Sequence, residues 1–209
     1  MSEIRIDFLG HACFKVSCEN RSVIFDPYEN GSVPGLKLPE PLDAERVYCS
    51  HEHGDHNARH LIHEADPLHD PFEVSFLTVP HDDANGALRG MNRITIVKIG
   101  ACRIIHMGDI GRLPTEEEYE QLSDADVMMI PAGGHYTIDA KQAAEIIGRA
   151  KPKLAILMHF RKGKTGYDVI ADIADVRKAF ASLREYEESS ICFDEADVPK
   201  GIITLTPAQ

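Results

Sequence analysis

Short apolar and alternating segments fill the first half of the chain and predict a β-rich region. Period-two alternation and brief apolar runs bounded by turn residues are typical of strands. The strands are expected at residues 4–10, 13–18, 21–27, 45–50 and 74–80, with a hairpin over 93–109 that turns at Gly100. Residues 27–44 hold many Gly and Pro and predict a long irregular loop, which is usually functional in a compact domain.

Strands and helices alternate in the second half. Helices are expected at 115–122 and 139–150, with Thr115 and Asp139 as N-caps, and at 168–185; strands are expected at 125–131, 152–160 and 201–207. No repeat or linker interrupts this pattern, and 209 residues with 43% hydrophobic side chains suit a single domain over residues 1–209. Two packed sheets covered on the outside by helices are the simplest arrangement.

Composition narrows the classes of partner. A formal charge of −12 disfavours nucleic acid, because a phosphate backbone is usually bound by clustered Lys and Arg. The charged N-terminus lacks an apolar signal core, and no apolar run approaches the roughly 18 residues that span a bilayer. Five cysteines without a CxxC pair suit a reducing compartment. We therefore expect a cytoplasmic protein that acts on a small molecule, with exposed edges that permit a homo-oligomer.

The segment "HEHGDH", residues 51–56, introduces the candidate chemistry. It can be a solvated polar loop, or it can supply metal ligands if other side chains join it. Further candidates stand where predicted strands end, and strand ends of one sheet can converge on one edge. The proposed ligands are His51, His53 and His81 for one ion, Asp55, His56 and His159 for a second, and Asp109 as a bridge. Three protein ligands per ion leave an open position, as in catalytic sites.

Longer motifs give the chain a family resemblance. The phrases are "GHACF", "IFDPY", "HDDANGALRGMNRITIV", "HMGDIG", "PAGGHYTIDAKQAAEI" and "PKLAILMHF", together with "HEHGDH". In these phrases the sequence resembles the metallo-β-lactamase superfamily, and within it the subgroup similar to L-ascorbate-6-phosphate lactonase. The resemblance implies an α/β (α+β) fold, an αββα sandwich of two mixed β-sheets flanked by helices, with a binuclear site at one edge. It departs at His135 and Arg112, where relatives often carry other residues.

The expected activity is hydrolysis of an ester, lactone or phosphoester of a small metabolite. The metabolite can be anionic, because the guanidinium of Arg89 is suited to binding a carboxylate or phosphate. Two divalent ions would share a hydroxide that attacks the substrate, and Asp55 would carry protons. Zinc leads among the metals, and Mn2+ and Fe2+ fit the same ligands. Substrate contacts are expected from His135, Tyr136, Arg89 and Asn92. The alternative for Arg89 and Asn92 is a structural brace between the loop and the hairpin, and the alternative for His135 is an exposed loop residue. His11 and Asp26 are expected to orient ligand imidazoles.

Other functions remain open on the sequence alone. An iron-dependent oxygenase or oxidoreductase of the same fold uses a similar ligand set, and a non-catalytic metal-binding protein would keep it. A nuclease of this fold is the third alternative, although 209 residues of this charge leave no room for the added arm that such nucleases carry.

Overall fold

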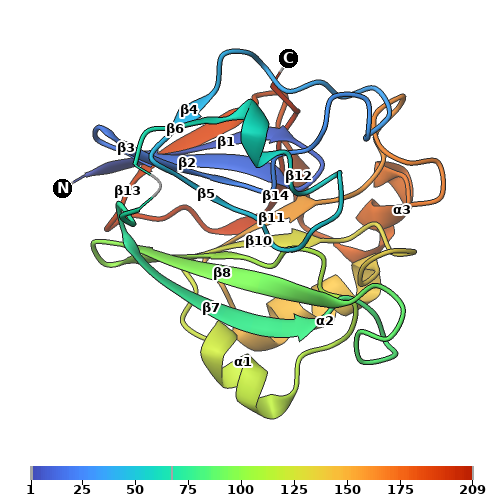
Figure 1. Ribbon diagram of the computed structural model, residues 1–209. Coiled ribbons are helices and arrows are strands. Elements are labelled where there is room, and N and C mark those ends of the chain that lie inside the picture. The colour runs from blue at the N-terminus through green and yellow to red at the C-terminus, as the bar shows by residue number, and fades with distance from the viewer. Residues whose placement is uncertain (1, 67, 209) are drawn as a thin grey trace.

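Two packed β-sheets form the centre of the computed structural model, which describes residues 2–66 and 68–208 (Figure 1). The five-stranded sheet has the order β13 (Ser190–Asp194), β1 (Glu3–Gly10), β2 (Cys13–Cys18), β3 (Arg21–Phe25) and β5 (Arg46–Tyr48). The seven-stranded sheet has the order β12 (Leu183–Glu185), β14 (Gly201–Thr204), β11 (Leu154–Met158), β10 (Val127–Pro131), β9 (Cys102–His106), β8 (Met91–Ile99) and β7 (Glu73–Pro80). A short pair, β4 (Asp43–Ala44) and β6 (His63–Glu64), stands apart.

The main core lies between the two sheets. Because successive side chains of a strand point to opposite faces, alternate residues of β1 such as Ile4 and Ile6 face inward. They belong to one buried cluster with Val127 and Met129 of β10. Both sheets contain parallel and antiparallel neighbours, as the pairing of β3 with β2 and β5 illustrates. The predicted sandwich of two mixed sheets is confirmed.

Helices cover the outer face of the seven-stranded sheet (Figure 1). They are α1 (Glu116–Leu122), α2 (Ala140–Ala150), α3 (Ile173–Val176) and the 3-10 turn η2 (Arg177–Ala179). Thr115 and Asp139 cap α1 and α2 in reciprocal capping boxes, as predicted. The outer face of the five-stranded sheet is covered instead by the predicted loop over residues 27–44 and by the 3-10 turn η1 (Arg59–Leu61). Tyr28 and Leu38 of this loop pack with Ile24 of β3.

The predicted helix over residues 168–185 is wrong. Only α3 and η2 are helical there, and Leu183–Glu185 forms the edge strand β12, which pairs in parallel with β14. The start of the segment is tied to another loop, because the Ala171 N–H donates to the Gly133 carbonyl at 2.8 Å. Asp172 then caps a new helix from within the segment. Pairing with distant segments thus overrides a helical sequence pattern. Three further strands, β13, β4 and β6, were also not predicted.

Strand direction brings the chemistry together. In the five-stranded sheet β1, β3 and β5 run the same way, since β2 is antiparallel to both β1 and β3 and β5 is parallel to β3. In the other sheet β7, β9, β10 and β11 also share one direction. The carboxyl ends of these strands therefore meet at common edges, where the polar motifs follow. Within the described residues, no helix has the length and apolarity to span a bilayer.

Candidate metal centre

Three imidazoles gather at one end of the centre. His51 lies in the turn after β5, His53 follows two residues later, and His81 directly follows β7. The His51 ring lies 4.5 Å from that of His53 and 4.4 Å from that of His81, centroid to centroid. One nitrogen from each of the three lies within 4.8 Å of the others. His51 and His81 are buried and His53 is exposed. The three residues predicted to share an ion therefore do lie together.

A second group gathers beside the first. Asp55, His56 and His159 each offer a donor atom within 4.8 Å of the others, and His11 joins them. Asp55 Oδ2 lies 3.6 Å from His56 Nε2 and 3.3 Å from His11 Nε2. The His11 and His159 rings are 4.0 Å apart. His11 was expected only to orient a ligand, and its position allows either that role or direct ligation.

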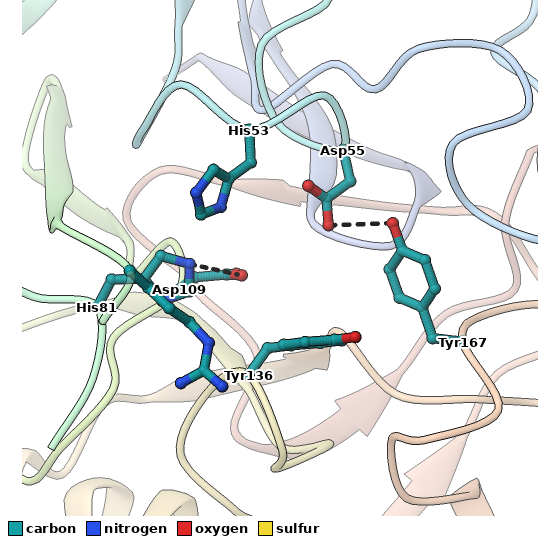
Figure 2. Close-up of a pocket in the computed structure, with 7 residues that line it drawn as sticks. His53, Asp55, His81, Asp109, Tyr136 and Tyr167 are labelled. Atoms are coloured by element: carbon teal, nitrogen blue, oxygen red, sulfur yellow. Dashed lines mark hydrogen bonds and ion pairs between the residues drawn. The ribbon is translucent and has the colours of Figure 1, made fainter.

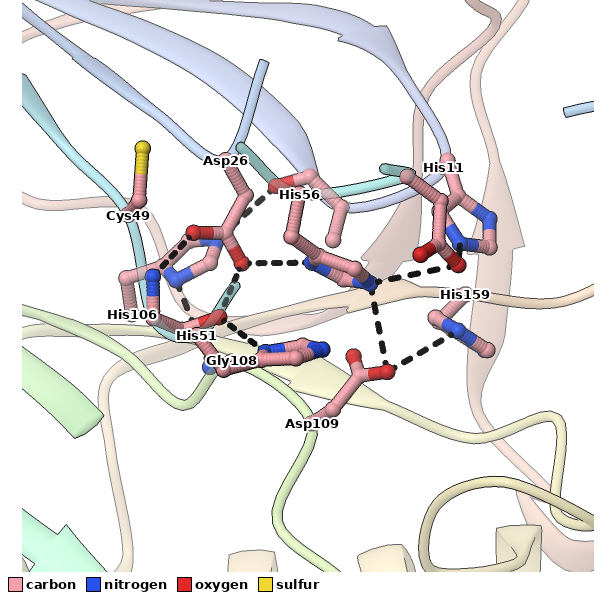
Figure 3. A network of polar contacts seen from close by, with 12 residues as sticks. His11, Asp26, Cys49, His51, His56, His106, Gly108, Asp109 and His159 are labelled. Atoms are coloured by element: carbon pink, nitrogen blue, oxygen red, sulfur yellow. Dashed lines mark hydrogen bonds and ion pairs between the residues drawn. The ribbon is translucent and has the colours of Figure 1, made fainter. Parts of the chain in front are cut away.

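Asp109 lies between the two groups (Figure 3). Its Oδ2 is 3.2 Å from His56 Nε2, 3.3 Å from His159 Nε2 and 3.7 Å from His81 Nε2. Gly108 has φ of +54°, a left-handed conformation that favours glycine, and an added Cβ would lie 2.3 Å from Asn92 Oδ1. Asn92 Oδ1 accepts the Asp109 backbone N–H at 2.8 Å. Its neighbours therefore place this carboxylate where it contacts both groups.

The residues present fit a divalent metal. Among the described residues, seven buried atoms of this cluster lack a hydrogen-bond partner: His11 Nδ1, His51 Nε2, His56 Nε2, His81 Nδ1, both nitrogens of His159, and Asp109 Oδ1. Buried polar atoms are rarely left unpaired, because an unmade hydrogen bond costs about 1–3 kcal/mol. Imidazole nitrogen and carboxylate oxygen are the donors that zinc, manganese and iron accept. The cluster thus has both the chemistry and the unsatisfied atoms of a metal site.

Asp26 fixes the orientation of two histidines, His51 and His56 (Figure 3). Its carboxylate is fully buried and accepts His56 Nδ1–H at 2.8 Å, the Ser50 N–H at 2.7 Å and the Ser50 hydroxyl at 2.6 Å. Because that hydroxyl donates to Asp26, the Ser50 oxygen accepts from His51 Nδ1, 2.9 Å away. Both rings are then left with Nε2 facing the candidate centre, the arrangement that metal-binding histidines commonly show.

Burial and neighbouring charge set the protonation of the cluster. Burial, reinforced by the charge of His56, lowers the pKa of His51 to about 3. Burial and the charge of His159 lower the pKa of His11 to about 4. Burial alone would raise the pKa of Asp109, but His159 and His56 hold it well below its ordinary value. His51 and His11 are therefore neutral and Asp109 is ionised near pH 7, which are the forms that bind metals.

A cavity of about 270 Å³ opens over the centre (Figure 2). Its walls are His53, Asp55, His81, Arg89, Asp109, Tyr136 and Tyr167. The Tyr167 hydroxyl donates to Asp55 Oδ2 at 3.3 Å, and the Arg89 guanidinium lies over the Tyr136 ring, 5.5 Å from its centroid. Four of the seven predicted ligands thus face a space that a small molecule can enter.

Two of the expected substrate contacts lie elsewhere. Asn92 is fully buried, and its Nδ2 donates to the Met107 carbonyl at 2.9 Å, so this amide braces the loop before Asp109. His135 is exposed and packs edge-on against Tyr136, and it is not part of the cavity wall. Asn92 and His135, which were expected to contact substrate, therefore do not line this cavity, whereas Arg89 and Tyr136 do.

Three residues of the site were missed on sequence grounds. Tyr167 follows a glycine in "KTGYD", directly before the helix that was predicted to begin at residue 168, and no role was predicted for it. Ser50, directly before His51, links that histidine to Asp26. Asp82 accepts four backbone N–H groups at 2.7–2.9 Å, including that of Arg89, and so shapes the loop that carries this arginine. The Asn85–Gly86 turn signal close after Asp82 could have indicated this loop.

Comparisons with known proteins identify the family to which the chain is similar. The family described as "Beta-lactamase superfamily domain" matches residues 5–159. A UPF0173 metal-dependent hydrolase of Carboxydothermus hydrogenoformans is 26% identical over 192 residues, covering 75% of this chain and 84% of that protein. A UPF0173 metal-dependent hydrolase of Archaeoglobus fulgidus is 27% identical over 212 residues, covering 84% and 90%. A Thermotoga maritima crystal structure, assigned to the metallo-β-lactamase superfamily, has a TM-score of 0.78 at 24% identity, covering 97% and 98%.

Proposed function

The chain belongs to the β-lactamase superfamily domain family, and from that membership we propose that it is a metal-dependent hydrolase that cleaves an ester, lactone or phosphoester of a small metabolite. Relatives of similar sequence carry the name metal-dependent hydrolase. The lactone is the first substrate class to test, because of the resemblance to L-ascorbate-6-phosphate lactonase. Zinc is the first metal to test, and manganese and iron suit the same donors.

One observation carries the proposal. Asp109 Oδ2 lies within 3.7 Å of imidazole nitrogens from both ligand groups, and its other oxygen is buried without a hydrogen-bond partner in the described chain. A carboxylate so placed suits a bridge between two ions, with His51, His53 and His81 on one and Asp55, His56 and His159 on the other. A purely structural cluster has no need of unpaired buried donors, whose presence costs stability.

Different residues of the cavity would have different roles in hydrolysis. Two divalent ions, when bound, would act as Lewis acids and lower the pKa of a water molecule towards neutrality. Asp55 presents one oxygen to His11 and Tyr167, which fixes the carboxylate at the edge of the cavity and leaves its other oxygen to accept a proton. Tyr136 and Arg89 form the side where the rest of a substrate would lie.

The cavity favours a small substrate. Its volume of about 270 Å³ lies just under the roughly 300–1,000 Å³ typical of small-molecule sites. The net charge of −12 opposes a long polyanion such as RNA. These two properties support a metabolite as the substrate over a nucleic acid.

The test combines metal analysis with an activity panel. The protein, purified without added metal, is analysed for its elements and assayed with that metal on lactones, phosphodiesters and thioesters. We expect near-stoichiometric zinc or manganese and turnover of at least one class, lost on Asp109→Asn. Asp124→Asn is the matched control, because Asp124 is exposed at the opposite end of β10. Iron alone with no hydrolysis in the panel would refute the proposal in favour of an oxygenase.

A further inference from the structure

A second hollow opens beside the cavity over the metal centre. It has a volume of about 420 Å³ and lies between residues 49–53 and residues 89–93. His53 and Arg89 border both spaces, so the hollow and the cavity adjoin at these side chains. The hollow falls within the size range of small-molecule sites. Nothing in the proposed hydrolysis step accounts for it.

Two arginines line this hollow without an acidic partner. Neither Arg89 nor Arg93 forms an ion pair in the chain as described, whereas Arg112 and Arg149 each lie within 2.7 Å of a glutamate oxygen. Arg93 donates one N–H to the Cys49 carbonyl at 2.9 Å, and its Nε is buried with no hydrogen-bond partner among the described residues. In a chain with 34 acidic residues and 22 basic ones, such unpaired guanidinium groups point to a missing anion.

Neighbouring contacts hold both arginines in place. Arg93 lies over the Phe76 ring, 4.5 Å from its centroid, and its Nη2 is held by the Cys49 carbonyl, so the guanidinium is fixed at the wall of the hollow. The Arg89 backbone N–H is held by Asp82 at 2.7 Å. A guanidinium presents its N–H groups in a fixed fork that matches a phosphate or carboxylate with two parallel hydrogen bonds. The fork geometry therefore favours an oxyanion over a neutral ligand.

The carboxylate of Glu52 argues against an anion in this hollow and also provides a test of it. Glu52 lines the same hollow, and its Oε2 accepts a hydrogen bond from Asn57 Nδ2. Its charge would repel an anion held nearby. Removing that charge should therefore strengthen anion binding, while removing the charge of Arg93 should weaken it.

We propose that this hollow is an anion subsite, in which Arg89 and Arg93 bind a phosphate or carboxylate group carried by the substrate. The inference rests on the proposed function, because the group belongs to the molecule that is hydrolysed in the adjoining cavity. It narrows the substrate class to esters, lactones or phosphoesters that carry a separate anionic group. The bond to be cleaved would lie over Asp109, and the anionic group would lie past His53.

Direct binding tests the subsite without any assumption about turnover. Inorganic phosphate and, in parallel, acetate are titrated calorimetrically into the purified full-length protein, with metal content measured and matched between variants. Arg93→Gln should weaken binding of the preferred anion about tenfold, and Glu52→Gln should strengthen it about threefold. Arg184→Gln, which removes an exposed arginine of the edge strand β12, is the charge-matched control and should have little effect. The preferred anion distinguishes a phosphate from a carboxylate subsite.

Equal affinity of wild type, Arg93→Gln and Arg184→Gln would overturn the inference, since the anion would then bind on the metal centre alone. Arg93→Lys, which keeps the charge without the fork, covers the case in which the glutamine variant fails to fold, and it should bind more weakly than wild type.

Kinetics separate failure of the subsite from failure of the hydrolase. A neutral lactone and the same lactone bearing a phosphate or carboxylate are compared in wild type and Arg93→Gln. The variant should lower kcat/KM for the anionic lactone about tenfold more than for the neutral one. Hydrolysis of both lactones with no such difference overturns the subsite alone. No hydrolysis of either, with phosphate affinity still dependent on Arg93, overturns the hydrolase and leaves the anion site in place.

Discussion

Replacement of Asp26 by Asn is the sharpest perturbation of the candidate centre that leaves every proposed ligand in place. The Asp26 carboxylate is fully buried and accepts three hydrogen bonds of 2.6–2.8 Å, from His56 Nδ1 and from the N–H and hydroxyl of Ser50. Through Ser50 it also orients His51. Asn has nearly the same shape, but it is neutral and must turn its NH₂ group towards one of these donors.

Two magnitudes follow from this geometry. Hydrogen bonds to a charged group contribute about 1.5–3 kcal/mol, compared with about 1 kcal/mol between neutral groups, and one donor in the variant would face another donor. We therefore expect the free energy of unfolding of the metal-free protein to fall by about 2–4 kcal/mol. Loss of a partner that orients a metal-binding histidine typically costs about 10–100-fold in metal affinity. Because Asp26 orients one histidine from each group, both ions should bind more weakly.

The assay is a zinc titration in competition with a chromophoric chelator, combined with urea unfolding of the metal-free protein. Ser50→Ala is the matched variant, because the Ser50 hydroxyl hydrogen-bonds to His51 directly and is linked to His56 only through Asp26. It should weaken the ion held by His51 and affect the other ion less, whereas Asp26→Asn should weaken both. Wild-type zinc affinity in Asp26→Asn, with an intact fold, would refute the idea that this carboxylate orients the two imidazoles.

Three further predictions address other parts of the site. Tyr167→Phe removes the hydrogen bond to Asp55 and should weaken zinc binding by up to about tenfold in the same titration without unfolding the protein; unchanged affinity would contradict it. Gly108→Ala places a Cβ within 2.6 Å of Ser50 and Asn92 atoms in left-handed backbone, so it should lower the free energy of unfolding in urea by about 2–4 kcal/mol. Gly148→Ala, in the last turn of α2 where an added Cβ meets open space, should raise it by about 0.5–1 kcal/mol. The pKa values of about 4 for His11 and about 3 for His51 lie below the unfolded value near 6.5, so the unfolded chain binds more protons at these two sites as the pH falls. The stability that these two imidazoles contribute is therefore present above pH 6.5 and should fall by about 2 kcal/mol per imidazole between pH 7.5 and 5.0. His56, whose pKa is raised by Asp109 and Asp26 against the effect of burial, contributes with the opposite sign, so the measurement is the difference between wild type and His11→Gln, in which the pH-dependent loss due to His11 should be absent.

The strands could be predicted from sequence because their burial depends on local pattern. Val127–Pro131 and Leu154–Met158 are continuously apolar, which is typical of central strands covered on both faces, and both are buried throughout. The helix predicted over residues 168–185 was wrong because the conformation of this segment does not depend on its local pattern. Its helical pattern is real, but backbone pairing with Gly133 and with β14 decides its conformation, and such pairing between distant segments leaves no local signal.

The candidate ligands could be predicted for two reasons. Metals bind only a few types of side chain, and the candidates of those types stand directly after predicted strands. His81, Asp109 and His159 each follow a strand within three residues, and all three strands run in the same direction. Tyr167 and Arg93 carried no comparable signal. The Tyr167 hydroxyl contacts Asp55 from 112 positions away, and Arg93 lies within a strand whose pattern indicates only a partly buried surface. Shape and mutual placement of loops, not residue type, bring these two side chains to the site.

Left-handed backbone ties the fold of this edge to its chemistry. His11, Asp26 and His159 have φ values of 56°, 43° and 54°, and each directly follows a strand, namely β1, β3 and β11. For residues other than glycine this conformation costs about 1–2 kcal/mol each, so something must offset it. The offset is visible in the contacts of the side chains: His11 with Asp55, Asp26 with Ser50 and His56, and His159 with Asp109. The strained turns and the donor cluster therefore depend on each other, since relaxing any of the three turns would withdraw a side chain from the centre.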